Sequence, residues 1–139
     1  MDQGGLANFL MGKIGVWLAV GGIITATLSM TGSFERTARS DELKAVLKCV
    51  TDALREIDRL PGEAWVEREL PRVSGEFKLD FVGNRGGAQL VRVMIGGENL
   101  ERIATLSTEV NGGEFEFTHE NPRVIRLTKR DGRIHMEVF

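Results

Sequence analysis

The first quarter of the chain is almost free of charge. Residues 14–33 contain no charged side chain, and Lys13 is the only one between Gly4 and Ser33. A helix needs roughly 20 apolar residues to cross a bilayer, and this stretch is about that long. Charge returns abruptly with Glu35 and Arg36. The pattern predicts a hydrophobic helix within residues 1–33, with a sharp boundary at its end.

Three interpretations of this apolar stretch compete. A buried helix of a soluble protein would need apolar neighbours on every side, and the rest of this small chain cannot easily supply them. A secretory signal peptide would be removed, but the stretch is long for one and its cleavage site is ambiguous. A retained membrane helix accounts for both the length and the charged boundary. We adopt the retained helix as the working expectation.

Small residues share one face of the predicted hydrophobic helix. They follow one another at spacings of four, three and four: Gly15, Ala19, Gly22 and Ala26. Such spacing lets a second helix approach closely in lipid and gain van der Waals contact. Glycine and alanine are also common in membrane helices generally, so a helix without a partner is compatible with the same residues. We predict a helix-packing face at these four positions.

Residues 34–62 show the period of an amphipathic helix. Apolar residues recur at threes and fours, with charged residues off that stripe. The stripe consists of Leu43, Val46, Leu47, Val50, Leu54 and Ile57. Pro61 and Gly62 end the helix because they break its backbone pattern. We expect the stripe to pack on the sheet of the same chain.

From residue 63 the period becomes two. Phe77, Leu79 and Phe81 alternate with charged residues, as in a half-buried strand. Tight turns are expected at 84–87, 96–97 and 111–113, and Asp131-Gly132 is typical of a hairpin. Short strands joined by such turns favour an antiparallel sheet of about five to seven strands, with the helix covering one face.

The predicted fold class is therefore a membrane-anchored α+β protein. A long N-terminal helix, hydrophobic and then amphipathic, precedes an antiparallel β-sheet head domain. The expected segments are a hydrophobic helix at 1–33, an amphipathic helix at 34–62 and a β domain at 63–139.

Composition removes several functional classes. The 139 residues carry a net charge of −2, so there is no basic surplus for nucleic-acid binding. Cys49 is the only cysteine, which excludes an intramolecular disulfide framework and a cysteine-rich zinc site.

Candidate catalytic chemistry is sparse. His119 and His135 are the only histidines, and neither has neighbouring residues that suggest a metal site. The glycines at 83–87 lack the Lys-Ser/Thr ending of a phosphate loop and lead into a strand. We predict no catalytic residue, no metal and no cofactor, and we expect the protein not to be an enzyme.

The order of segments resembles archaeal type IV pilin-like proteins. The resemblance comprises a short polar start at Asp2-Gln3-Gly4-Gly5, an apolar helix, an amphipathic extension and a β-rich head. In that family a peptidase cleaves after a glycine that precedes the apolar helix. The resemblance thus implies leader cleavage at Gly4 or Gly5, helices packed in a filament core and an outward head.

This resemblance implies a structural subunit or an accessory protein of a cell-surface filament. The expected partners are membrane lipid and copies of the chain or related pilin-like subunits, with the β domain outside the cell. A different count favours the opposite topology, because one basic residue precedes the apolar span and four soon follow it. An anchored or secreted β domain that binds a ligand or partner is the alternative function.

Overall fold

The computed structural model describes residues 35–139, which form one helix and eight strands. The helix spans residues 35–59, and the compact body comprises Arg39–Phe139. The strands are β1 (Ala64–Glu69), β2 (Lys78–Gly86), β3 (Ala88–Ile95), β4 (Glu101–Leu106), β5 (Glu109–Val110), β6 (Phe115–Glu120), β7 (Val124–Arg130) and β8 (Arg133–Val138).

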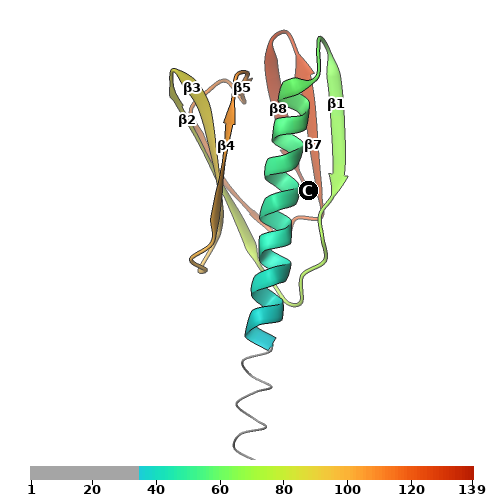
Figure 1. The fold of residues 1–139 in the computed structure, drawn as a ribbon, viewed down its shortest axis with the longest axis vertical. Coiled ribbons are helices and arrows are strands. Elements are labelled where there is room, and N and C mark those ends of the chain that lie inside the picture. The colour runs from blue at the N-terminus through green and yellow to red at the C-terminus, as the bar shows by residue number, and fades with distance from the viewer. Residues whose placement is uncertain (1–34) are drawn as a thin grey trace, which may run out of the picture. The chain divides into compact units, whose positions relative to one another are not determined.

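The strands form two four-stranded sheets. One sheet has the order β1-β7-β8-β5 and the other the order β4-β3-β2-β6. All neighbouring strands are antiparallel except β5 and β8, which pair in parallel over two residues. The two sheets stand apart at the level of the helix, which runs alongside both of them (Figure 1).

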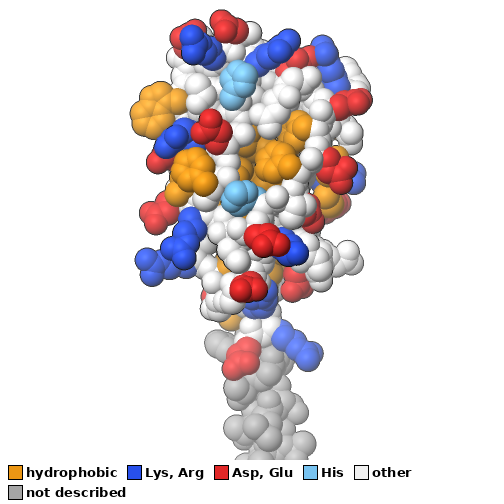
Figure 2. Space-filling view, turned by 180° about the vertical axis from the view of Figure 1, so that it is seen from behind, with side chains coloured by type: hydrophobic (Ala, Val, Ile, Leu, Met, Phe, Trp, Pro, Cys, Tyr) orange, Lys and Arg blue, Asp and Glu red, His pale blue; other side chains and the backbone are white. Residues whose placement is uncertain are grey.

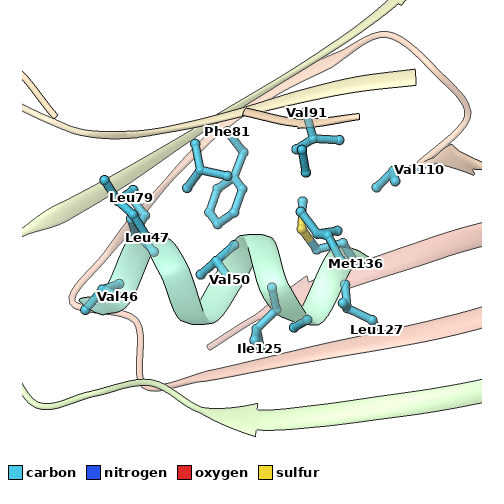
Figure 3. Close-up of a cluster of buried hydrophobic side chains, with 14 of the residues drawn as sticks. Val46, Leu47, Val50, Leu79, Phe81, Val91, Val110, Ile125, Leu127 and Met136 are labelled. Atoms are coloured by element: carbon cyan, nitrogen blue, oxygen red, sulfur yellow. The ribbon is translucent and has the colours of Figure 1, made fainter. Parts of the chain in front are cut away.

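The helix fills the space between the sheets. Phe81 and Val91 approach it from one sheet, whereas Ile125 and Leu127 lie on the strands at its other side (Figure 3). Burial follows the expected stripe: Leu43, Val46, Leu47, Val50, Leu54 and Ile57 are all at most 2% exposed. The period of three and four therefore marks a helix face that is buried by both sheets rather than by one.

The last two strands form the hairpin expected at Asp131-Gly132. Strands β7 and β8 pair in register from Ile125 with Val138 to Arg130 with Arg133. Asp131 and Gly132 both have positive φ angles, 53° and 73°. Two successive positive φ angles match the turn whose twist fits a two-residue hairpin, and aspartate followed by glycine tolerates them well.

The predicted fold class was wrong. The body contains two sheets with a helix between them, instead of one sheet with a helix on one face. Within residues 35–139, no helix is long and apolar enough to cross a membrane. The sheets were misjudged because β1 pairs with β7, far along the chain, and not with β2. A period of two identifies a strand but does not say which sheet it joins.

The hydrophobic helix expected within residues 1–33 lies outside the described residues.

Candidate functional site

The first turns of the body's helix are tied to the β1–β2 connection. The Glu42 carboxylate accepts hydrogen bonds from the backbone N–H of Ser74 at 2.9 Å and from its hydroxyl at 3.2 Å. The Arg39 guanidinium donates to the backbone carbonyls of Ser74 and of Glu76. Both partners of these side chains lie more than 30 residues away in sequence. The start of the body is therefore fixed by long-range contacts.

The C-terminal end of the helix is held to the loop between β4 and β5. The Asp58 carboxylate accepts hydrogen bonds from the Ser107 hydroxyl at 3.0 Å and from the backbone N–H groups of Ser107 and Thr108 at 3.1 and 2.9 Å. Burial alone would raise the pKa of Asp58, but these hydrogen bonds together lower it below its ordinary value. Asp58 is thus a charged anchor for the loop between β4 and β5.

Two further contacts join the last turns of the helix to the sheets. Both carboxylate oxygens of Glu56 accept from Arg68 on β1, at 2.8 and 2.7 Å. Arg55 donates to the backbone carbonyl of Ile103 at 3.2 Å, on the edge strand β4. A free strand edge is a place where foreign strands can pair. The helix therefore ties down β1 and occupies part of the β4 edge.

A pocket of about 530 Å³ lies where the chain crosses between the sheets. Its walls come from the β1–β2 connection and the β6–β7 turn, and they include Phe77, Pro122 and Arg123. Phe77 and Asn121 form two hydrogen bonds there, both at 2.9 Å. The Asn121 side-chain Oδ1 accepts from the backbone N–H of Phe77, and the backbone N–H of Asn121 donates to the backbone carbonyl of Phe77. The lining contains arginine and glutamate but no histidine, serine or cysteine that could act as a nucleophile.

The two histidines do not meet. His119 lies on β6 opposite Leu79, and His135 lies on β8 opposite Thr128, in the other sheet. Among residues 35–139, no group of three or more histidine, cysteine or acidic side chains is placed to hold a metal ion.

Cys49 lies on the helix and is half-buried. Its sulfur is 3.9 Å from the backbone oxygen of Glu69. Burial raises the pKa of the Cys49 thiol, although the nearby Arg68 charge opposes this. Because the thiolate is the reactive form, a raised pKa makes Cys49 a poor nucleophile.

Large hydrophobic side chains are exposed on the body, among the charged ones (Figure 2). Trp65 is 71% exposed on β1, and Leu90 and Ile103 are about 41% and 42% exposed on β3 and β4. Sequence reasoning did not single these residues out. A signal was present in residues 89–95, where Leu90 and Met94 make the second face of a buried strand apolar as well. An apolar residue on both faces of a strand indicates a second contact surface.

The residues predicted as a helix-packing face, Gly15, Ala19, Gly22 and Ala26, lie outside the described residues, and so do the predicted cleavage positions Gly4 and Gly5. The structure therefore places none of them. Comparisons of the chain with protein-family models, with curated proteins and with solved structures find no match.

Proposed function

We propose that the chain is a type IV pilin-like structural subunit or accessory protein of a cell-surface filament. The proposal rests on the contrast between two parts of the chain: a body that buries its own apolar residues, and an apolar stretch that precedes it. The helix and strands of the body supply its hydrophobic core. The exposed side of the helix carries charged residues. The uncharged residues 14–33 precede this body in the sequence. A long apolar stretch of this kind needs a partner, and copies of the same stretch provide one.

The body then has the role of a displayed head without a catalytic centre. Its helix is held to both sheets through Asp58, Arg55 and Glu56, which suits a unit that must remain folded while its start is held in an assembly. In this proposal the head faces the exterior of the cell. Copies of the chain, or related subunits, are the partners.

A β domain that binds a ligand or partner is the second candidate. The exposed Trp65 and the pocket beside Phe77 favour it. A tryptophan on a protein surface often contributes strongly to binding when a partner covers it.

The test compares two glycine substitutions in the full chain. On a helix, Gly22 shares a face with Gly15, Ala19 and Ala26, whereas the neighbouring Gly21 points about 100° away. Gly22→Leu adds bulk to the proposed contact, and Gly21→Leu adds the same bulk beside it. Electron microscopy of cells and membrane extracts is expected to show filaments for the natural chain and for Gly21→Leu, but not for Gly22→Leu.

Two results would contradict the proposal. Absence of filaments and of any self-association for the natural chain removes the filament role and leaves the partner-binding domain. Equal loss of filaments in both variants removes the helix face as the means of assembly, because the effect would then follow bulk and not position.

A further inference from the structure

Strand β6 is an outermost strand whose free side has no partner strand in the described part of the chain. It pairs with β2 only. In an antiparallel pair, the backbone groups of successive residues point alternately toward the partner strand and away from it. The hydrogen bond from the Asn121 N–H to the Phe77 carbonyl, at 2.9 Å, sets this alternation for β6. The backbone N–H and C=O groups of Glu116, Thr118 and Glu120 therefore point to the free side.

The bonding of β2 to its other neighbour gives the same alternation. The Gly96 N–H donates to the Lys78 carbonyl at 2.9 Å, so the even-numbered residues of β2 bond β3 and its odd-numbered residues bond β6. The odd-numbered residues of β2 lie opposite the odd-numbered residues of β6. The backbone groups of the even-numbered residues of β6 are therefore left open, and no other residue within 35–139 forms a hydrogen bond with them.

The other outermost strands are less available. On β4, the carbonyl of Ile103 accepts from Arg55 at 3.2 Å. On β1, the carbonyl of Glu67 accepts from Arg68 at 2.9 Å. Strand β5 is only two residues long. Because an open strand edge is a template for pairing with another chain, β6 is the strand of the described body that is best placed to receive one.

The inward side chains of β6 are only half-buried, because no further strand covers them. Phe117 stacks on Phe81 with ring centroids 4.8 Å apart, and Phe115 stacks on Phe117 at 5.8 Å. Phe81, on the next strand, is fully buried, whereas both rings of β6 keep part of their surface exposed. A strand added beside β6 covers that surface with the side chains that face the same way. Those side chains must be apolar.

The outward side of β6 is acidic. Glu116 has no ion pair with a described residue, and Glu120 has one, with Lys78 at 3.2 Å. Asp80 adds a third carboxylate on the same side of β2. Lys78 is the one basic side chain on this side of the two strands, so their net charge there is −2. The next basic group on this side is Arg92 on β3, which is two strands away from β6.

A second copy of β6 does not fit this edge. In an antiparallel pair centred on Thr118, Glu116 of each copy lies opposite Glu120 of the other. Like charges directly opposite each other destabilise a strand pair. The outermost strand β1 carries Glu67 and Glu69, so it fits no better. The edge therefore selects a strand with basic side chains on its outward side.

We propose that β6 docks an extended segment of another protein in which basic and apolar residues alternate. The segment adds a fifth strand to the four-stranded sheet and pairs with the open backbone groups of β6. Its apolar side chains cover Phe115 and Phe117, and its basic side chains meet Glu116 and Glu120. In such contacts the backbone hydrogen bonds give affinity and the alternate side chains give specificity. The contact needs neither the apolar stretch nor a filament, so it goes beyond the proposed function and is tested separately from it.

The probe is a short synthetic peptide in which lysine and valine alternate, with blocked ends and a fluorescent label. Its binding to the full chain in mild detergent is measured by fluorescence anisotropy at low salt, with detergent alone as the blank. We expect binding, and we expect it to be roughly tenfold or more weaker when glutamate replaces lysine or when the lysines and valines form separate blocks. Absence of binding, or equal binding of the three peptides, overturns the proposal.

Backbone methylation of the peptide separates strand pairing from charge attraction. In the antiparallel pair, the residues opposite Glu116, Thr118 and Glu120 are the lysines, so the lysine N–H groups donate to β6 and the valine N–H groups point away. N-methylation of the lysines is expected to abolish binding, whereas N-methylation of the valines is expected to leave most of it. Equal effects of the two methylations overturn the proposal, because charge alone would then hold the peptide.

Matched variants locate the contact on the protein. Proline lacks an N–H, and an edge strand tolerates it where that N–H faces the free side. Thr118→Pro is expected to abolish peptide binding, whereas Thr105→Pro, at an edge-facing position of β4, is expected to leave it unchanged. Glu116→Lys is expected to weaken binding about fivefold or more, and Glu101→Lys, on β4, by less than about twofold.

Thermal melting of each variant shows whether the body is folded. If Thr118→Pro does not fold, the charge exchange still decides: Glu116→Lys is expected to bind the glutamate–valine peptide more tightly than the natural chain does. The proposal is overturned if that exchange has no effect, or if the folded variants of β6 and of β4 bind the lysine–valine peptide equally.

Discussion

The side-chain ammonium of Lys129 donates a hydrogen bond to the backbone carbonyl of Leu60 at 2.8 Å, just beyond the end of the helix. It also donates to the carbonyl of Asp58 at 3.1 Å. The last carbonyls of a helix lack partners within the helix, and a positive charge near them is favourable. A strand of the sheet that contains β1 and β7 thus satisfies the C-terminal end of the helix, while Asp58 binds the loop that follows β4 in the other sheet.

The first prediction concerns this contact. Lys129→Met keeps the apolar stem but removes the donor, so we expect the free energy of unfolding to fall by about 1–2 kcal/mol. Arg130→Met is the matched control. The Arg130 side chain lies next to Lys129 in the sequence, is 70% exposed and has only a long ion pair to Asp131. Urea denaturation followed by circular dichroism measures both. Equal losses in the two variants would show that Lys129 contributes no more than an ordinary surface charge.

The second prediction concerns the acid side of the stability profile. Because the pKa of Asp58 is lower in the folded state, its charge stabilises the fold above its unfolded pKa of about 3.8. That contribution is lost as the pH falls through the lower, folded pKa. Asp58→Asn lacks this titration. We therefore expect the variant to be less stable than the natural chain above about pH 5, and we expect the difference to shrink as the pH falls. Denaturation midpoints from pH 7 down to pH 2 measure the difference. A constant difference across that range would contradict the role of the charge.

Part of the fold could be predicted from the sequence because it depends on local patterns. The stripe from Leu43 to Ile57 is buried as its spacing indicates, and Asp131-Gly132 forms its hairpin. The division into two sheets could not be predicted, because it is decided by the pairing of β1 with β7 about 60 residues later. The parallel pair of β5 and β8 is only two residues long and leaves no pattern in the sequence.

The contacts of the candidate site were equally hidden. In the sequence, three of the residues involved look like ordinary charges on the solvent-exposed side of a helix: Arg39, Glu42 and Asp58. Their hydrogen-bond partners are between 32 and 50 residues away. Only the position of the helix between two sheets brings them to those backbone groups. The apolar outer side of β3 was detectable in part, since Leu90 and Met94 are apolar on the side of the strand that a single covered face would leave polar.

The third prediction concerns the helix as a part of the core. Leu54 is fully buried between the sheets, so Leu54→Ala removes apolar contacts and leaves a cavity. We expect a loss of about 2–5 kcal/mol in the free energy of unfolding. Ala45→Ser, on the exposed side of the same helix, is the control and is expected to change stability by less than about 0.5 kcal/mol. A small effect of Leu54→Ala would mean that the β sheets fold without the support of the helix.

The fourth prediction concerns Gly83, which lies opposite Phe115 on neighbouring strands. A Cβ atom at Gly83 would overlap the Phe115 ring, which also stacks on Phe117 with centroids 5.8 Å apart. Gly83→Ala is therefore expected to displace the ring and to lower the free energy of unfolding by about 1–3 kcal/mol. Gly86→Ala, in the same strand, has no atom within 4 Å of the added Cβ and is the matched control.

A double-mutant cycle identifies the cause of that loss. If the overlap with Phe115 is responsible, adding Gly83→Ala to a Phe115→Ala chain costs much less than adding it to the natural chain, because the ring that it displaces is gone. The stabilities of the four chains, measured by urea denaturation, give the coupling directly. Equal costs of Gly83→Ala in the two backgrounds would place the loss elsewhere, since neither the ring nor its stacking on Phe117 would then be involved.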